Sequence, residues 1–313
     1  MRVAVIGANG FVARHVCLAL ADAGNEVIAV VRRPEITQLP GVTEVRHMAD
    51  AGPETEWAPL IADANAVLHL VSPSPGESEK ETTAYRRVKD GTLALARSAA
   101  ANSVKRLVFV STIKVNGEAT TTEPFRPGTN PSPVASYGTI KLETENGLAA
   151  VSTETGLPIT VVRPGAVYGT GGISNIHMLC RILTIFPGWM IPLGGIENKR
   201  SLIHVENLAS ALAKCVEDNS NINRLFLLHD GVALSTSELC RLILAGLNKP
   251  TLLLPDPFQI IRFLISIFLP GYARRLYGSL EIEDTSIQDA LGWEPPLSTA
   301  EGLKRALASA RDQ

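Results

Sequence analysis

The chain has 313 residues, of which 45% are hydrophobic, 19% are charged and 5% are aromatic, and its formal net charge is −2. This length and hydrophobic content are enough for one large α/β domain, or for a domain with a smaller partner. They exclude a disordered or collagenous chain. A net charge near zero without any basic run argues against a protein that binds nucleic acid.

The chain contains four widely separated cysteines: Cys17, Cys180, Cys215 and Cys240. No pair has the CxxC spacing, so neither a disulfide framework nor a zinc site is predicted, and we expect no other metal site. Unpaired cysteines are typical of a reducing compartment, and we therefore expect a cytoplasmic protein.

Two apolar segments could be mistaken for targeting or membrane signals. The N-terminus resembles a signal peptide, but Asn9, Arg14 and His15 interrupt its apolar run, and we interpret it as part of the fold. Residues 258–270 are fewer than the roughly 20 that a spanning helix needs, and they include Arg262. We expect no membrane span. A helix packed on a second domain is the simpler interpretation, and a helix lying on a membrane surface is the alternative.

Short apolar and β-branched runs alternate with helical patterns in the first half of the chain, as in proteins with a parallel sheet. The expected strands are 3–6, 27–31, 44–47, 66–70, 107–111 and 159–163. The expected helices lie near 11–23, 80–101 and 136–151. Runs such as VIAVV are apolar throughout, which indicates strands covered on both faces. The predicted fold class is therefore α/β, a doubly wound parallel sheet (Rossmann fold).

The pattern changes after this half, where glycines and prolines become frequent. A helical stretch at 206–217 and the strand-like LFLL follow, and S-x-x-E capping signals predict helix starts at Ser235 and Ser298. We predict a sheet domain and a smaller, partly helical C-terminal domain. The sheet domain would comprise 1–166 and 204–230, and the smaller domain 167–203 and 231–313.

One connection, 116–136, is unusually long, rich in Thr, Pro, Gly and Asn, and without periodicity. Compact domains rarely carry such a loop unless it binds a ligand or acts as a lid. Because it follows a strand, it should lie above the carboxyl edge of the sheet, where open α/β folds bind ligands.

The sequence GANGFVA, residues 7–13, follows the first strand directly and opens a helix. Glycines in this position permit a tight turn and a close approach of the backbone to a pyrophosphate at the helix N-terminus. A simple glycine turn is the alternative, but the position inside a βαβ pattern favours dinucleotide binding. The contacts are expected from residues of this turn: Gly7, Asn9, Gly10, Phe11 and Val12.

The end of the second strand should distinguish NAD from NADP. An acidic residue there would bind a ribose 2′-hydroxyl, whereas an arginine would pair with a 2′-phosphate. The chain has Arg32 and Arg33 and no acid, which favours NADP over NAD, although these arginines could also form a solvated turn. Asp50 is a candidate for contact with the adenine, and Leu70 and Pro164 end strands that would flank the cofactor.

Tyr137 and Lys141 form a Y-x-x-x-K pair, which places a phenol and an ammonium on one helix face. A nearby cation should lower the pKa of the tyrosine, which could then exchange protons with a sugar or alcohol oxygen while a nicotinamide moves hydride. The spacing also occurs by chance on surface helices. The glycine turn, the long loop and the hydroxyls of Ser111 and Thr112 at a strand end favour catalysis.

Six motifs in order carry a resemblance: GANGFVA, VSTIKVNGE, YGTIK, VVRPGAVYGTG, RSLIHVENLA and LGWEPP. Over essentially its whole length, the chain resembles the extended short-chain dehydrogenases/reductases, the NAD-dependent epimerase/dehydratase family that acts on nucleotide sugars. The resemblance implies a catalytic triad of Thr112, Tyr137 and Lys141, and the last two would also bind the cofactor.

The resemblance also implies substrate contacts outside this triad. Asn175 would contact the nucleotide, Arg200 and Arg275 its pyrophosphate, and Thr112 and Lys114 the substrate near the reacting centre. A capping Asn and solvated arginines are the alternatives.

The chain also departs from the family pattern at two positions. Val88 stands where the family usually has Asn, and Asn116 where many epimerases have Tyr.

The string STIKVNGE is similar to a subgroup tied to bacterial O-antigen (lipopolysaccharide) and capsule sugars. The leading hypothesis is an NADPH-dependent reductase of a UDP-4-keto-6-deoxy-N-acetylhexosamine at C4. The first alternative is a UDP-sugar 4-epimerase with tightly bound NAD, and the second is a non-catalytic dinucleotide sensor. A homodimer formed through helices 80–101 and 136–151 is expected by resemblance.

Overall fold

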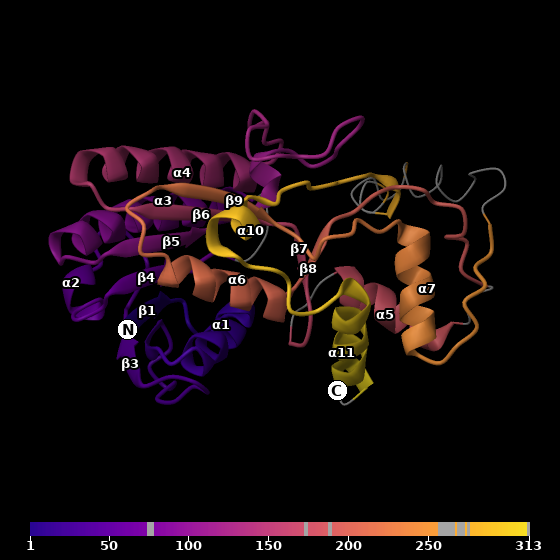
Figure 1. Cartoon of the computed structure of the whole chain (residues 1–313), viewed down its shortest axis with the longest axis horizontal. Helices are drawn as coiled ribbons and strands as arrows, with labels where there is room; N and C mark the ends of the chain where they lie inside the picture. Colours follow the sequence, from indigo (N-terminus) through magenta and orange to yellow (C-terminus); the bar gives the residue numbers. More distant parts are fainter. Residues whose placement is uncertain are drawn as a thin grey trace.

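A computed structural model describes residues 1–73, 78–171, 175–186, 190–255, 267, 273 and 276–311. Its centre is a seven-stranded parallel sheet with the strand order β3-β2-β1-β4-β5-β6-β9 (Figure 1). The strands are β1 (Arg2–Ile6), β2 (Glu26–Val31), β3 (Glu44–His47), β4 (Ala66–His69), β5 (Arg106–Val110), β6 (Ile159–Pro164) and β9 (Arg224–Leu228). The predicted doubly wound parallel sheet is confirmed, and the predicted strands agree with the observed ones to within about one residue at each end.

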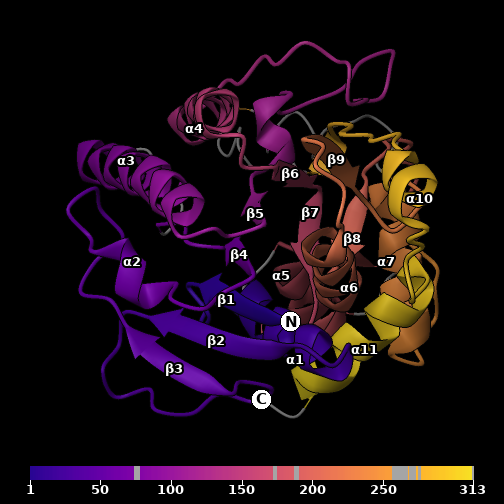
Figure 2. The same ribbon diagram turned by 60° about the vertical axis from the view of Figure 1, so that its left-hand side comes forward.

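Helices cover both faces of the sheet (Figure 2). One layer contains α1 (Phe11–Asp22) and α6 (Val205–Glu217), and the other contains α2 (Trp57–Leu60), α3 (Glu79–Ala101) and α4 (Ser136–Thr155). Alternate residues of β1, β2, β4, β5 and β6 pack into one layer or the other, which is why these strands are largely apolar. The edge strand β3 (EVRH) is polar and only partly buried. The sheet is therefore buried on both sides and leaves its carboxyl edge for ligands.

A second group of helices lies beyond this edge (Figure 1). It comprises α5 (Asn175–Ile185), α7 (Thr236–Gly246) and α11 (Thr299–Arg311), which share a separate apolar core. Ser235 caps α7 as predicted, and Ser298 makes the same reciprocal contacts with Glu301. Two short strands join this part to the sheet domain, β7 (Ala166–Tyr168) and β8 (Leu202–His204), which pair in parallel and were not predicted. The short helix α10 (Ser286–Leu291) packs back on the sheet.

The long connection after β5 is held in place. It begins with the 3-10 helix η1 (Ile113–Val115). The amide of Phe125 donates to the carbonyl of Glu281 at 2.8 Å, and the amide of Glu283 donates back to Phe125 at 2.9 Å. The Phe125 ring is 8% exposed and packs with Leu280 and Ile282. This loop therefore ties the sheet domain to the C-terminal part of the chain.

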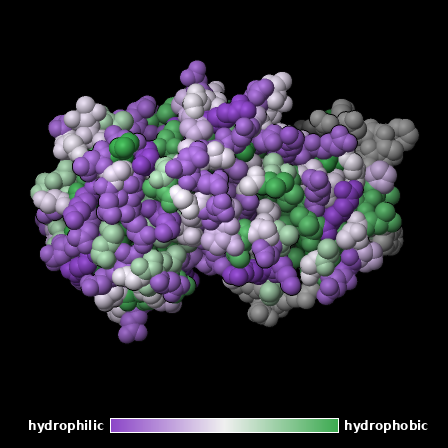
Figure 3. Space-filling model, viewed as in Figure 1, coloured by the Kyte–Doolittle hydropathy of each residue, from purple (hydrophilic) through white to green (hydrophobic). Residues whose placement is uncertain are grey.

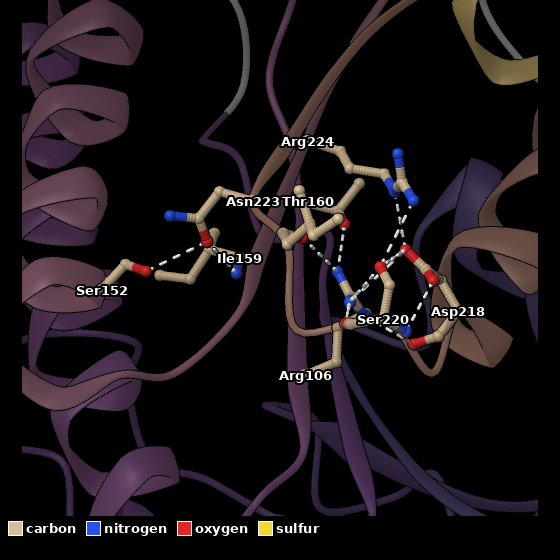
Figure 4. Close-up of polar contacts among 9 residues, drawn as sticks. Arg106, Ser152, Ile159, Thr160, Asp218, Ser220, Asn223 and Arg224 are labelled. Atoms are coloured by element: carbon tan, nitrogen blue, oxygen red, sulfur yellow. Dashed lines mark hydrogen bonds and ion pairs between the residues drawn. The ribbon is translucent and has the colours of Figure 1, made fainter. Parts of the chain in front are cut away.

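The opposite, amino edge of the sheet is closed around Arg106, which is 2% exposed (Figure 4). Its guanidinium donates to Thr160 Oγ1 at 2.8 Å and to the Asp218 carbonyl at 2.8 Å, and it lies 3.4 Å from the Asp218 carboxylate. Arg224 donates to the same carboxylate at 2.8 Å. These contacts hold the turn before β9 against β5 and β6, so the sheet has a rigid base far from its ligand edge.

The surface differs between the two parts. Polar residues cover most of the sheet domain in this view, and apolar ones gather over α5 and α7 (Figure 3). Exposed apolar side chains in this region are Ile185, Phe186, Met190, Leu252 and Leu254. None of the helices in the described part of the chain is long and apolar enough to cross a membrane. The predicted helix 258–270 lies outside the described residues, apart from Ile267.

Candidate active site

The glycine turn after β1 has the geometry expected of a dinucleotide-binding loop. Gly7 has φ +85°, and its amide donates to the Val30 carbonyl at 2.9 Å, while the amide of Gly10 donates to Gly7 at 3.0 Å. A Cβ at Gly7 would lie 3.0 Å from Val71 Cγ2 and 3.3 Å from its amide nitrogen. Both the backbone conformation and the lack of space therefore require glycine here.

The first turn of α1 is open to a ligand. Its N-cap residue is Gly10, and no side chain caps the helix. The amides of the first turn, among them those of Phe11 and Val12, therefore have no side-chain acceptor at the positive end of the helix dipole. This arrangement fits the pyrophosphate of a dinucleotide cofactor.

The residues expected at the adenosine end lie at the ends of β2 and β3. Arg32 is exposed. Asp50 pairs with Arg87 on α3 at 2.5 Å, and Arg87 also reaches Glu54 at 2.8 Å. Burial raises the pKa of Asp50, but hydrogen bonds from Arg87 and the Ala51 backbone and the charges of Arg87 and Arg32 outweigh it, so this pKa is lowered. Asp50 is therefore ionised and engaged by Arg87, a contact that the sequence did not predict.

Strands in the middle of the sheet bring the remaining cofactor candidates to the same edge. Leu70 follows β4 and donates its amide to the Ile6 carbonyl at 3.0 Å, which places it beside the glycine turn. Pro164 ends β6 and is buried. Parallel strands end on one side, so both residues lie on the edge that carries Gly7.

Tyr137 lies in the first turn of α4 and is half-buried. The side chains of Ser72 and Thr112 lie near its hydroxyl. Burial raises the pKa of Tyr137, and the two neighbouring hydroxyls only partly offset the effect. The structure therefore contradicts the expectation that Lys141 lowers the pKa of this phenol, because burial outweighs the other influences and the ammonium is engaged elsewhere.

Lys141 is 8% exposed, and its Nζ donates to the Val110 carbonyl at 3.0 Å. The ammonium also lies 4.5 Å from the centre of the Phe109 ring, in a cation–π contact. Burial lowers the pKa of Lys141 to about 8, and the charge of Glu145 opposes the shift. A lysine with this pKa changes its charge close to neutral pH.

Thr112, whose hydroxyl lies at the end of β5, has an extended backbone conformation. Thr112 is the N-cap of η1, and its Oγ1 accepts a hydrogen bond from the Lys114 amide at 3.3 Å. The Lys114 side chain pairs with Glu118 at 3.7 Å. Thr112 and Tyr137 therefore meet at the carboxyl edge, while Lys114 starts the loop above it.

Of the three substrate candidates further along the chain, the structure describes the side chain of one, Arg200. Arg200 is half-buried, its Nη1 donates to the Gly278 carbonyl at 3.0 Å, and its backbone pairs with Leu234 and Leu280. Asn175 begins α5, but its side chain lies outside the described part of the structure. Arg275 is not among the described residues.

The sequence did not identify three residues that contact this site. Ser72 lies near the Tyr137 hydroxyl, and Tyr85 on α3 packs its ring against that of Tyr137. His69 ends β4 and is 1% exposed. The position of Ser72 just beyond β4 was a usable signal, because residues that follow central strands reach the ligand edge.

Comparison with known proteins gives one family. The model of the NAD dependent epimerase/dehydratase family matches residues 3–226. The UDP-glucose 4-epimerase of Vibrio cholerae is 31% identical over 306 residues, which cover 96% of this chain and 92% of that protein. The dihydroflavonol 4-reductase of Hordeum vulgare is 32% identical over 120 residues and covers 35% of this chain and 34% of that protein.

Solved structures share the fold over the whole chain. The UDP-glucose 4-epimerase of Thermotoga maritima with UDP-glucose has a TM-score of 0.78 at 22% identity. The match covers 100% of this chain and 99% of the epimerase chain. The UDP-N-acetylglucosamine 4-epimerase of Bacillus cereus has a TM-score of 0.74 at 18% identity, with 99% of both chains covered. Because the family's model spans most of the sequence, the chain belongs to the NAD dependent epimerase/dehydratase family.

Proposed function

We propose that the protein oxidises and re-reduces C4 of a UDP-sugar with a nicotinamide dinucleotide, as a UDP-sugar 4-epimerase. The observation that carries the proposal is the position of the Tyr137 hydroxyl, which lies near the side chains of Thr112 and Ser72 at the edge that carries the glycine turn. The similarity over 96% of the chain to a UDP-glucose 4-epimerase supports this choice.

The proposed chemistry needs one proton and one hydride to leave the sugar and return. When bound, the nicotinamide takes hydride from C4 and gives it back. Tyr137, as phenolate, accepts the proton of the 4-hydroxyl, and Thr112 donates a hydrogen bond to the same oxygen. Tyr137 would return the proton to the same oxygen when C4 is reduced from its opposite face, which gives the epimer. No net oxidation results.

Lys141 supplies the positive charge in this scheme. Its ammonium is buried and fixed by Val110 and Phe109, so its charge acts in surroundings of low dielectric constant. In the ionised form, it offers hydrogen-bond donors to the ribose of the cofactor. Its ionisation near neutral pH makes the activity sensitive to pH.

A UDP-4-keto-6-deoxy-N-acetylhexosamine 4-reductase is the second candidate. Arg32 and Arg33 follow β2 directly, with no acidic residue at the strand end, which favours a 2′-phosphate and hence NADPH, the usual donor in net reductions. The raised pKa of Tyr137 also favours a protonated phenol, which is the form that donates a proton to a keto oxygen. A non-catalytic dinucleotide sensor would have no need of this proton-transfer set.

The fate of the cofactor separates these candidates. An epimerase should be purified with NAD that is released only on denaturation, and it should interconvert UDP-GlcNAc with UDP-GalNAc, or UDP-glucose with UDP-galactose. A reductase should instead consume NADPH in proportion to a UDP-2-acetamido-4-keto-2,6-dideoxyhexose. Cofactor binding with neither reaction, and an unchanged phenotype in Tyr137→Phe, would favour the sensor.

Three further assignments extend the proposal. The part formed by α5, α7 and α11 would bind the nucleotide sugar, with Asn175, Arg200 and Arg275 as its contacts. The protein would form a homodimer through α3 and α4, which pack side by side on one face of the sheet (Figure 2). It would act in the cytoplasm, in O-antigen or capsule sugar synthesis. Size measurement in solution tests the dimer.

A further inference from the structure

Four buried polar side chains meet behind Thr112 and Lys141, and the chemistry above uses none of them. Ser111 donates a hydrogen bond to the Glu145 carboxylate, and Arg163 donates to it from Nε at 3.1 Å and from Nη2 at 2.5 Å. The other end of Arg163 donates to Asn116 Oδ1 at 2.8 Å. All four are at most 8% exposed. The four side chains form a buried hydrogen-bonded network that includes the Arg163–Glu145 ion pair.

Three members of this network, Ser111, Arg163 and Glu145, adjoin residues of the proposed site. Ser111 precedes Thr112, and Arg163 precedes Pro164 at the end of β6. Glu145 follows Lys141 by one turn of α4, which places the two side chains on one face of the helix. The network is therefore placed to fix both the backbone of the catalytic strand end and the charge beside the catalytic lysine.

The charged and titratable groups around Lys141 come from four elements. On α4 itself are Tyr137 and Glu145. On β4, His69 is buried, and burial and the charge of Lys141 lower its pKa to about 3, so it is neutral. On β6, Arg163 is paired with Glu145. On α3 are Tyr85 and Lys89, and Lys89 is paired with Glu143 at 3.2 Å.

Glu145 thus offers the compensating negative charge for a buried ammonium. A carboxylate taken out of water is itself unfavourable unless it is paired and hydrogen-bonded, which Arg163 and Ser111 provide. Arg163 and Lys141 are both cations, and the single carboxylate lies between them in the network. Loss of the carboxylate would leave two buried cations without an anion.

We propose that Glu145 is a positioning residue that Arg163 and Ser111 fix by hydrogen bonds, and that its charge keeps the Lys141 ammonium protonated and directed to the Val110 carbonyl. This inference rests on the proposed function only in giving Lys141 its role as the catalytic cation. The network itself is independent of the substrate. A purely structural ion pair would stabilise the fold without changing the ionisation of Lys141.

The test is direct titration of Lys141 by NMR in protein labelled with ¹³C at the lysine side chains, with the signal assigned by its loss in Lys141→Met. In Glu145→Gln, the pKa of Lys141 should fall by about one pH unit, as expected when an opposite charge within a few ångströms is removed. Glu143→Gln is the matched control, because Glu143 lies on the same helix and pairs with Lys89. It should leave the titration unchanged.

The conservative variant and a double variant complete the experiment. Glu145→Asp keeps the charge and should restore most of the pKa of Lys141, even where the fold is less stable. If Glu145→Gln does not fold, Glu145→Gln combined with Arg163→Met removes both buried charges and should still lower the pKa of Lys141. An unchanged titration in whichever of these neutral variants folds overturns the proposal.

Activity gives a second readout that separates the two proposals. The alkaline limb of kcat should move to lower pH in Glu145→Gln and stay in place in Glu143→Gln. A shifted titration in a protein without epimerase or reductase activity would reject the proposed function and keep the role of Glu145. An unshifted titration in an active enzyme would reject the role of Glu145 and keep the proposed function.

Discussion

The aromatic rings of Tyr85 and Tyr137 lie 5.2 Å apart between centroids, with their planes inclined by 49°. Tyr85 belongs to α3 and is 4% exposed, so a neighbouring helix fixes the ring that is proposed to transfer protons. Such a ring pair restricts the side-chain torsions of both partners. Packing against Tyr85 therefore helps to keep the Tyr137 hydroxyl near Thr112 and Ser72.

Tyr137→Phe removes the proton-transfer group and preserves the ring contact with Tyr85. We expect turnover to fall by about 10²–10⁴-fold, the usual contribution of a positioned acid or base. The free energy of unfolding and the affinity for the dinucleotide should change little. Steady-state kinetics, thermal unfolding and cofactor titration measure these quantities. Tyr85→Phe is the control, and a similar loss of turnover in it would argue against the assignment.

Lys141→Met should increase stability and abolish activity. The folded protein has a Lys141 pKa of about 8, below the ordinary value of 10.5, so protonated Lys141 is unfavourable in the fold. The unfolded chain binds more protons than the folded one between pH 8 and 10.5, and the contribution of Lys141 to stability rises with pH over this interval. Over the whole interval, this contribution changes the free energy of unfolding by about 3 kcal/mol.

Urea unfolding of both proteins at pH 7 and pH 10 measures this effect. The advantage of Lys141→Met over the parent should be largest at pH 7 and smaller at pH 10. Lys89→Met serves as control, since Lys89 is more exposed and paired with Glu143. An advantage that does not depend on pH would contradict the pKa shift.

His69 should make the protein sensitive to mild acid. It is 1% exposed, its Nε2 lies 3.3 Å from Thr92 Oγ1, and burial lowers its pKa to about 3. Below the ordinary pKa of 6.5, the unfolded chain takes up a proton that the folded chain does not, so stability falls with falling pH. Between pH 6.5 and 5, the loss is about 2 kcal/mol.

Comparison with His69→Gln isolates this contribution. The parent should lose stability relative to the variant as the pH falls from 7 to 5, in urea unfolding followed by circular dichroism. His47→Gln, at an exposed position, should retain the pH dependence of the parent. Parallel pH dependences of the parent and His69→Gln would refute this prediction.

The base of the sheet should be the main electrostatic determinant of stability. Arg106→Met leaves the Asp218 carboxylate, which is 6% exposed, without its buried cation, although Arg224 still contacts it. Breaking a buried pair costs about 3–5 kcal/mol. Arg305→Ala breaks an exposed pair with Glu206 and should cost less than about 1 kcal/mol. Equal costs in chemical denaturation would show that burial of Arg106 is unimportant.

Phe125→Ala should release the loop that follows η1. The ring fills an apolar cluster with Ile113, Leu280 and Ile282, and its removal should cost about 3 kcal/mol. Because Ile113 adjoins Thr112, kcat should also fall, and limited proteolysis should cut the loop between 116 and 135 more rapidly. Val134→Ala changes a side chain that is 69% exposed and should have no such effect. Unchanged proteolysis of Phe125→Ala would mean that its ring does not hold the loop.

Much of the sheet domain was predictable because its signals are local. Most of the strands are short apolar runs, and the helices between them require parallel, right-handed connections. The turn at Gly7 could be recognised because its backbone conformation and the space at its Cβ position permit only glycine. The spacing of Tyr137 and Lys141 places them on one helix face whatever surrounds them.

The sequence by itself thus determined the fold class, the glycine turn and the helix that carries Tyr137 and Lys141. Only the tertiary structure decided the partners of these residues. The contacts of Glu145 with Ser111 and Arg163, and of Phe125 with Glu281, join segments far apart in the chain and carry no local pattern. The pKa of Tyr137 also depends on burial, which exists only once the strands and helices have packed together.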